Sequence, residues 1–590
     1  MNKSLQINAR EENLTAIFPS NLYIIPVYQR PYSWDISKCE QLWDDLMMFI
    51  ETNNNSDAYF LGTIIVTNEI DEDMDNNTLL RNVESSSVID GQQRLTTLSL
   101  LMNALFEKDP KNSKLKECLY NIDSRDTDKL KSLRIISKVN NNSEFNFYSA
   151  NFKVTDYSKN MDNSYSFKDK HYSENFNWFK NKILGLTIDQ IYELSDVLLD
   201  KVTILKVQVP KREDALVIFK TINDRGMQLD ETDILKAEIY DGANKKNEGQ
   251  LFIESWEALY QKISALESRI KDFDMSTLFR YYMHIKRGIN EDSSKEISLL
   301  DFFKGKSIKS KEIIKENHLG SIPWKNIMND LYRICGAFEW LVYKNKGDVP
   351  YLYNILLCYP NLYPSYALMA YLFKHVVTND GNNYFLQKND IDNFITFFDK
   401  LMAYSYATLI LKPGVNSIKE VIHKLIISII HSKDLSDIEL TKYTKSDFEK
   451  IKEYLEDDIS NKVIKGYLMI LAHINENTDK KSTLQNVKLL TTEHILPKNW
   501  DDNWYDQWNE EKKEYAMNKL GNLVLLDRSS NIKASNTWFE KKKEIYSKGD
   551  FKNGEMLDLL NKKSWTYEDF EERQEDSVRK LLKFMKKSQI

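Results

Sequence analysis

Apolar residues recur at three- and four-residue spacing through much of the middle of the chain. The clearest stretches are residues 251–285, 324–343, 391–411 and 421–431. Because this spacing places apolar side chains along one face of an α-helix, the middle of the chain is predicted to be mostly helical. Residues 349–373 are uncharged over 25 positions, but prolines and asparagines interrupt them. We therefore expect two buried helices joined at residues 359–364 rather than a membrane span.

Shorter apolar runs near the carboxy-terminus predict strands. Residues 487–490 and 522–526 are apolar and bounded by polar turns, which is typical of short strands. Residues 536–543 are predicted to form a helix capped by the Asn at its first position. Thr566, with Asp569 three residues later, predicts a capping box at the start of a final helix.

Length, charge and cysteine content limit the possible classes of protein. A chain of 590 residues is long enough for about four domains by length alone. The net charge of −7 argues against a protein coated in DNA-binding charge, so contact with nucleic acid would need local basic patches. The four cysteines form no Cys-x-x-Cys pair and the amino-terminus has no apolar signal core. We therefore expect a cytoplasmic protein without a membrane partner.

The sequence Glu-His-Ile-Leu-Pro at residues 493–497 is the strongest candidate for chemistry. Histidine has an unperturbed pKa suited to taking a proton from water near neutral pH, which makes His494 a candidate general base. Cleavage of a phosphodiester also needs a divalent cation, Mg²⁺ or Mn²⁺, held by oxygen ligands that leave room for phosphate and water. Glu493 and Asn531 are the candidate metal ligands, with Asn536 as an alternative to Asn531.

This stretch resembles the ββα-metal (HNH) nucleases, in which an acidic residue precedes the catalytic His on the first strand. In that family an Asn at the start of the second strand holds the catalytic loop, and a metal-binding Asn or His opens the following helix. Asn522 and Asn531 lie nine residues apart, which fits that spacing. The resemblance implies that Asn522 belongs to the catalytic set with His494. The basic run 541–543 could contact phosphate, although such runs are more often a solvated helix face.

A second candidate site lies near the amino-terminus, in the sequence Asp-Gly-Gln-Gln-Arg. Its residues are Asp90, Gly91, Gln92, Gln93 and Arg94. An apolar strand ends just before this block and a helix continues after it, so the free amides of a helix amino-terminus could face an anion. Arg94 adds a guanidinium fork that matches phosphate, and the two glutamines can donate hydrogen bonds. From the residues alone, Asp90 and Arg94 could equally form a structural ion pair.

Two further blocks, residues 24–34 and 219–229, accompany the 90–94 block. The three together resemble the ParB-like amino-terminal domain of GmrSD-type modification-dependent restriction enzymes, and a phosphorothioate-sensing relative of the SspE type shares the layout. The resemblance implies that the three blocks bind a nucleoside triphosphate (NTP), GTP or ATP, with hydrolysis as an expected activity. The further candidate contacts are Gln29, Arg30, Asn223 and Arg225.

Together the two ends predict an α+β multidomain protein. We expect a ParB-like α/β sensor and NTPase domain at residues 1–245, a helical domain at 246–450 and an HNH nuclease domain of ββα-metal type at 451–590. The expected function is a DNA endonuclease of anti-phage defence, regulated by the NTP, and a homodimer is one state left open. The alternative is a nucleotide-dependent DNA-binding regulator whose nuclease fold only grips DNA. His494 and Glu493 argue against it, because gripping needs neither residue.

Overall fold

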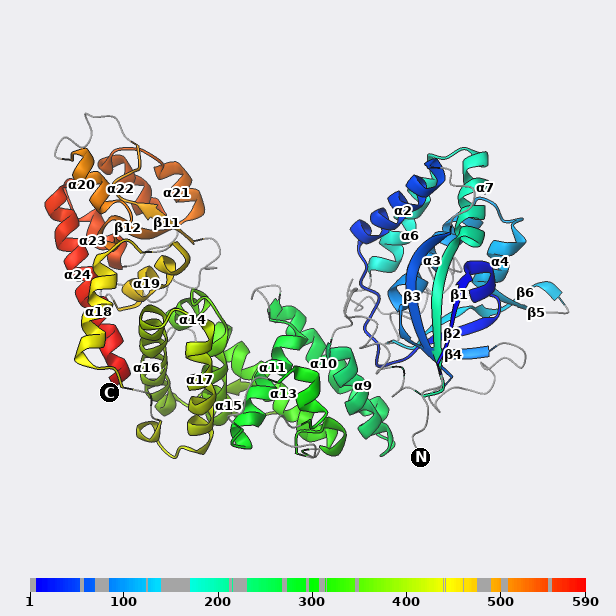
Figure 1. Cartoon of the computed structure of the whole chain (residues 1–590), viewed down its shortest axis with the longest axis horizontal. Coiled ribbons are helices and arrows are strands. Elements are labelled where there is room, and N and C mark those ends of the chain that lie inside the picture. Colours follow the sequence, from blue (N-terminus) through cyan, green and yellow to red (C-terminus); the bar gives the residue numbers. More distant parts are fainter. Residues whose placement is uncertain are drawn as a thin grey trace. The chain divides into compact units, whose positions relative to one another are not determined.

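The chain forms two compact units, Met1–Ile253 and Glu254–Ile590 (Figure 1). The computed structural model describes residues 7–52, 58–68, 84–123, 126–139, 170–211, 215, 231–267, 273–292, 297–306, 314, 316–344, 350–381, 383–438, 440, 442–459, 461–474, 490–499, 508–549 and 554–589. The second unit contains both the residues expected for the helical domain and those expected for the nuclease domain.

The described part of the first unit is built on a mixed six-stranded sheet, with the order β1-β8-β3-β4-β2-β7. Its strands are β1 (Asn8–Asn13), β2 (Asn21–Ile25), β3 (Tyr59–Thr67), β4 (Glu84–Asp90), β7 (Ile135–Ser137) and β8 (Val202–Val209). The pairs β2/β4, β2/β7 and β3/β8 are parallel, whereas β1/β8 and β3/β4 are antiparallel. A separate antiparallel pair joins β5 (Tyr120–Asp123) to β6 (Asp126–Leu133).

Neighbouring residues of a strand point to opposite faces of the sheet, and in the central strands both sets of side chains are buried. Ile64 and Val66 lie in the main core, whereas Ile65 belongs to a smaller cluster with Ile89 and Val207. Helices that contribute to the main core are α1 (Leu14–Ile17), α2 (Ile36–Glu51), α3 (Gln92–Phe106), α4 (Ser113–Leu119), α6 (Lys170–Leu184) and α7 (Ile188–Asp196). The π-helix η2 (Val197–Lys201) connects α7 to β8, and α9 (Glu231–Asn244) follows later in the chain.

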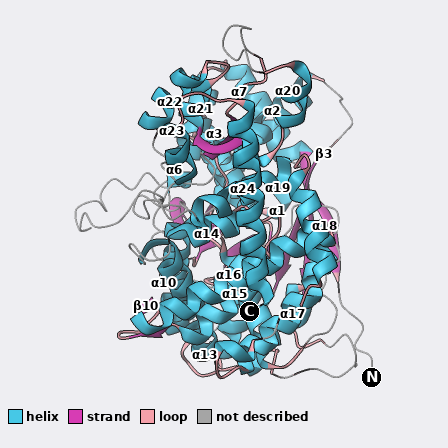
Figure 2. Ribbon diagram, turned by 90° about the vertical axis from the view of Figure 1, so that its left-hand side faces the viewer, coloured by secondary structure: helices cyan, strands magenta, loops and turns pink. Residues whose placement is uncertain are grey.

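Helices, cyan in Figure 2, make up most of the second unit. They are α10 (Gly249–Glu267), which begins just before the unit boundary, α11 (Met275–Ile289), α12 (Leu299–Phe303), α13 (Trp324–Glu339), the π-helix η5 (Trp340–Lys344), α14 (Pro350–Leu357), α15 (Tyr363–His375), α16 (Lys388–Leu411), α17 (Val415–His431), α18 (Lys445–Glu456) and α19 (Asn461–Ile474). Within the described residues the predicted helical stretches are confirmed, with 251–285 divided between α10 and α11, and so are the two helices in the uncharged segment. A short strand pair, β9 (Val377–Thr378) with β10 (Tyr384–Phe385), follows α15.

One helix in the described part of the chain, α16, is long and apolar enough to cross a membrane. However, 67% of its most apolar window is buried inside the protein. It packs against α15, α17, α18 and the carboxy-terminal helix α24 (Tyr567–Lys586). Such burial is typical of a helix in the core of a helical bundle.

The strands β11 (Leu490–His494) and β12 (Leu523–Asp527) form an antiparallel pair near the end of the second unit. The helix α21 (Arg528–Ala534) follows directly. The predicted strand at 522–526 is confirmed with a shift of one residue. The predicted first strand is observed from Leu490 onward, while residues 487–489 lie outside the described part of the chain.

The helix predicted at 536–543 is confirmed from Phe539 onward, but its predicted start and its Asn536 cap are wrong. The preceding helix, α21, is capped by Asp527, whose Oδ1 accepts a hydrogen bond of 2.8 Å from the Ser530 amide. Asn536 is exposed after the end of α21, and the next helix, α22 (Phe539–Lys548), has Trp538 at its N-cap. The predicted capping box of Thr566 and Asp569 is confirmed at the start of α24. The remaining helices of this region are α20 (Glu510–Ala516) and α23 (Gly554–Leu560).

Candidate functional site

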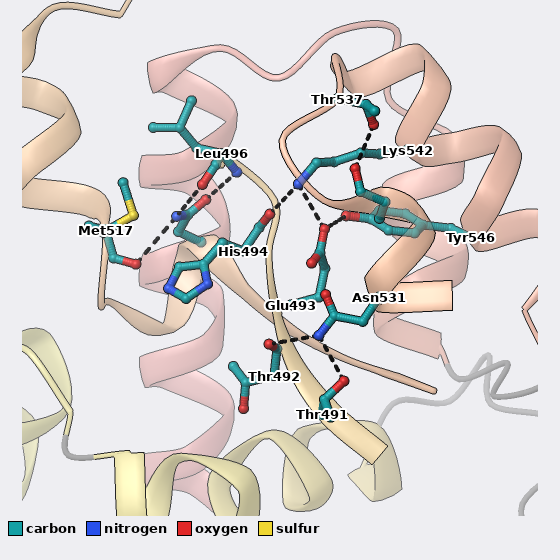
Figure 3. A network of polar contacts seen from close by, with 12 residues as sticks. Thr491, Thr492, Glu493, His494, Leu496, Met517, Asn531, Thr537, Lys542 and Tyr546 are labelled. Carbon is teal, nitrogen blue, oxygen red and sulfur yellow. Dashed lines mark hydrogen bonds and ion pairs between the residues drawn. The ribbon is translucent and has the colours of Figure 1, made fainter. Parts of the chain in front are cut away.

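The candidate nuclease residues gather at the end of β11 (Figure 3). Glu493 is 4% exposed and points toward α22, whereas the His494 ring extends to the opposite side of the strand and is half-buried. This divergence follows from the alternation of side chains along a strand. Thr491 shares the face of Glu493, and Asn531 of α21 contacts this face.

Asn522 holds the loop that follows His494. Its side chain is fully buried, and its Oδ1 accepts a hydrogen bond of 2.7 Å from the Leu496 amide. Its Nδ2 donates to the carbonyl oxygens of Leu496, at 3.2 Å, and Met517, at 3.4 Å. Its own carbonyl accepts from the Ile495 amide at 2.9 Å. This geometry agrees with the loop-holding role that the resemblance implied.

The helix α24 fixes the residues that precede β12. Arg573 Nη1 donates to the carbonyl oxygens of Leu520, Gly521 and Leu523, at 2.7–3.0 Å. Gln574 Oε1 accepts from the Gly521 amide at 2.7 Å. A Cβ at position 521 would lie 2.8 Å from the carbonyl oxygen of Phe570 in α24, so only glycine allows this approach. Sequence patterns did not reveal these contacts, because each side chain binds backbone groups of a distant segment.

The environment of His494 favours the neutral imidazole. Burial, followed by the charges of Lys498 and Lys542, lowers the pKa of His494 to about 4. Removing the ring from water disfavours its charged form, and nearby ammonium groups act in the same direction. At neutral pH the ring therefore carries an unprotonated nitrogen that can accept a proton.

Glu493 forms a buried ion pair with Lys542 of α22. Lys542 is fully buried, and its Nζ lies 2.7 Å from Glu493 Oε1 and 2.6 Å from the carbonyl oxygen of His494. Tyr546, one helical turn later, donates to the same Oε1 at 2.9 Å. The interpretation of residues 541–543 as a solvated face is therefore wrong for Lys542, because this position belongs to the inner face of α22. Burial raises the pKa of Glu493, while the Lys542 charge opposes the shift.

Asn531 lies on the Glu493 side of the strand. Its Nδ2 donates to Thr491 Oγ1 at 2.7 Å and to the Thr492 carbonyl at 3.2 Å. These two bonds fix the amide group, so the geometry favours Asn531 over the exposed Asn536 as a partner of Glu493.

The donor set is chemically suitable for a hard divalent cation but small. It comprises one carboxylate, Glu493, and one amide oxygen, that of Asn531. The hydrogen bonds from Lys542 and Tyr546 both fall on Oε1 of Glu493, and the carboxylate also interacts with the His494 amide, so Oε2 is the atom that it would offer to a cation. No group of three or more His, Cys, Asp or Glu residues able to hold a metal exists among the described residues. Most ligands of a bound cation would thus be water or phosphate oxygens, as is common for Mg²⁺.

In the first unit, the candidate glutamines hold the 26–34 segment to the start of α3. Gln92 Nε2 donates to the Arg30 carbonyl at 2.9 Å. Gln93 Oε1 accepts from the amides of Ser33 and Trp34, and its Nε2 donates to the Pro31 carbonyl. A third glutamine, Gln29, donates through its Nε2 to the carbonyls of Val88 and Ile89 at the end of β4. These amides satisfy backbone groups of an irregular segment, and their role as ligand contacts stays a prediction.

Charged side chains surround Asp90 at the end of β4. Burial raises the pKa of Asp90, while the guanidinium groups of Arg94 and Arg30 oppose the shift. Arg94 also donates to the Thr63 carbonyl. Arg30 lies 4.0 Å from Asp233, an acidic residue of α9 that the sequence did not single out. The structure thus brings together Arg30, Asp90 and Arg94.

Gly91 is required at the turn between β4 and α3. Its φ of 91° lies in the left-handed region, and a Cβ there would be 2.6 Å from Ile64 Cγ2. Both constraints exclude larger residues. Asn223 and Arg225 lie outside the described residues, so their place relative to this cluster is untested.

Two family models match the chain, one in each half. The family model described as the N-terminal domain of GmrSD restriction endonuclease matches residues 10–240, and the model of the C-terminal domain of GmrSD restriction endonucleases matches residues 441–579. The chain belongs to the GmrSD restriction endonuclease family. No curated protein matches it.

The restriction endonuclease domains of the GmrSD family imply that DNA is the substrate and that the chain is a hydrolase. The Asp90 cluster lies within the N-terminal match, and His494, Asn522 and Asn531 lie within the C-terminal match. Both candidate sites thus belong to the two domains that define the family.

Replacing Asn522 with Ala should destabilise the nuclease region. The change leaves the Leu496 amide without its buried acceptor, which costs about 1–3 kcal/mol. Chemical denaturation followed by tryptophan fluorescence should show the loss, and DNA cleavage should fall because the loop after His494 is released. The control is Asn561→Ala, since Asn561 is exposed. Equal stability of the two variants would contradict the role of Asn522.

The His494 ring should titrate far below an ordinary histidine. In metal-free protein, histidine-selective NMR should show its midpoint near pH 4, assigned by the loss of the signal in His494→Gln. The unfolded chain binds this proton near pH 6.5. Between pH 6.5 and 4 the unfolded chain binds a proton at His494 that the folded chain does not. The free energy of unfolding is therefore unaffected by this histidine above pH 6.5 and decreases as the pH falls toward 4. A midpoint near 6.5 would contradict the burial argument.

Proposed function

We propose that this chain is a modification-dependent DNA endonuclease of HNH type. Its second unit would hydrolyse phosphodiester bonds with Mg²⁺ or Mn²⁺, and its first unit would make cleavage depend on a bound NTP. The observation that carries the nuclease proposal is the position of His494. Its neutral ring stands on the last residue of β11, beside Glu493 in the sequence and directly before the loop that Asn522 fixes.

His494 would take the proton from the attacking water. A pKa of about 4 leaves the ring unprotonated at neutral pH but makes it a weak base. A DNA phosphate brought close to the ring would raise that pKa, because a negative charge favours the imidazolium. The base would thus gain strength when the substrate binds.

Glu493 and Asn531 would hold the cation at the end of β11, on the side of the strand opposite to the His494 ring. When bound, the cation stabilises negative charge on the phosphate and on the leaving oxygen. The Asn531 amide is oriented by Thr491 and Thr492, so its oxygen needs no large movement to act as a ligand. Asn522 would act by holding the loop rather than by touching the substrate.

The Asp90 cluster would bind the NTP. Arg94 and Arg30 carry two guanidinium groups near one partly buried carboxylate, an arrangement that suits a phosphate chain. Because Arg30 pairs with Asp233 of α9 across 4.0 Å, NTP binding at Arg30 could release that contact and change the position of α9. Such a change would give the first unit two states with different nucleotide affinity.

A substrate panel tests the proposal directly. Purified protein would be offered unmodified, phosphorothioated and glucosylated DNA, with Mg²⁺ or Mn²⁺ and with each NTP. We expect cleavage of one modified class and dependence on both the cation and an NTP. Cleavage of every DNA alike would refute modification dependence.

His494→Ala should abolish DNA cleavage, since removal of a general base costs about 10²–10⁴-fold in rate. NTP hydrolysis should remain, because the side chain would act only on the water that attacks DNA. Cleavage of a plasmid and release of inorganic phosphate would be measured in parallel. Near wild-type cleavage would exclude His494 as the base and favour a protein that only grips DNA.

Arg94→Ala should weaken NTP binding and remove the effect of the NTP on cleavage. Calorimetry would measure nucleotide affinity, and cleavage would be compared with and without the NTP. The matched control is Arg10→Ala, because Arg10 is exposed on β1 of the same unit. Unchanged affinity would refute the assignment of the site, whereas lost affinity with unaltered NTP dependence of cleavage would refute the coupling.

A further inference from the structure

Lys542 contacts both residues at the end of β11 that carry the candidate nuclease chemistry. Its ammonium is fully buried and bonds to two consecutive residues of β11, through Glu493 Oε1 at 2.7 Å and the His494 carbonyl oxygen at 2.6 Å. Figure 3 shows the side chain reaching from α22 to the strand end that carries both residues. Lysine is among the residues least often found fully buried. Its presence here therefore needs a specific reason.

The two bonds connect the two halves of the candidate active site. One orients the carboxylate that faces Asn531, and the other fixes the backbone from which the His494 ring extends. Tyr546 adds a second donor to Glu493 Oε1 at 2.9 Å, from the same face of α22. The carboxylate therefore has little freedom to rotate, and its Oε2 keeps a defined direction.

We propose that Lys542 is a positioning residue of the nuclease site, which holds Glu493 and the backbone of His494 and whose charge weakens cation binding until DNA is present. This inference rests on the proposed nuclease function and deepens it. The Glu493 carboxylate supplies one negative charge, and the Lys542 ammonium neutralises it. A divalent cation on Oε2 would share that carboxylate with the ammonium and be repelled by it.

The charge balance gives the site a dependence on its substrate. With the carboxylate already neutralised, the additional negative charge that a divalent cation requires must come from elsewhere. A DNA phosphate supplies such charge next to Oε2 and the Asn531 oxygen. Cation and DNA should therefore bind cooperatively, and the free protein should bind the cation weakly.

Two variants separate the charge of Lys542 from its hydrogen bonds. Lys542→Met removes both, and Lys542→Gln removes the charge while retaining a donor. Lys541→Met is the matched control, because Lys541 neighbours Lys542 on α22 but is exposed and pairs with Glu544. Mn²⁺ binding would be measured by electron paramagnetic resonance with and without DNA, and kcat and KM would be measured for DNA cleavage.

Lys542→Met should bind Mn²⁺ about tenfold more tightly in the absence of DNA, because a repelling charge is removed at short range. Its kcat should fall about 10–100-fold, since partners that orient a metal ligand typically contribute this much. The gain in Mn²⁺ affinity on adding DNA should shrink, and so should the effect of Mn²⁺ on KM for DNA, because coupling between two ligands is reciprocal. Lys542→Gln should show the tighter Mn²⁺ binding with a smaller loss of kcat, and Lys541→Met should resemble the wild type.

Unchanged or weaker Mn²⁺ binding in a folded Lys542 variant would overturn the charge argument, and wild-type kcat in Lys542→Met would overturn the positioning role. If Lys542→Met does not fold, Lys542→Gln decides both points. The proposed nuclease function fails on other results: a wild type that binds no Mn²⁺ even with DNA, or a His494→Ala variant that still cleaves. Circular dichroism of each variant establishes that it is folded.

Discussion

Two opposite charges, those of Glu493 and Lys542, are buried together in the nuclease region, and much of the local structure follows from that requirement. Such charges are tolerated away from water only when they are paired and their hydrogen bonds are made. Pairing them requires α22 to pack directly against β11. Tyr546 and the His494 carbonyl then complete the bonds. The packing that satisfies the charges thereby sets the direction of both candidate catalytic side chains.

A second set of contacts acts on the opposite side of the same strand pair. Asn522 fixes the loop after His494, and α24 fixes the residues on either side of Asn522 through Arg573 and Gln574. Two helices that follow the strand pair in the chain therefore hold the site, α22 through Glu493 and the His494 carbonyl and α24 through the residues beside Asn522. Its rigidity comes from hydrogen bonds to backbone groups, which restrict the chain whatever side chains those residues carry.

Sequence reasoning succeeded where the signal was local. The order of β11, β12 and Asn522 follows from short apolar runs and their spacing, and the helices of the middle region follow from periodicity. It failed for Lys542, because a run of three lysines does not show which of them faces the interior. It did not predict that Gln92 and Gln93 bind the backbone of the 26–34 segment, and their role toward a ligand stays a prediction. Such contacts depend on tertiary packing that no nearby residue reveals.

The place of α24 in the chain has a consequence for synthesis. Arg573 and Gln574 reach back by about fifty residues to hold the Gly521 segment, so the loop behind His494 lacks these bonds until α24 has left the ribosome. A nascent or truncated chain that ends before α24 would carry His494, Glu493 and Asn531 without the support that orders them. The candidate site therefore depends on the last long helix of the second unit, although its own residues lie on β11, just before β12 and on α21.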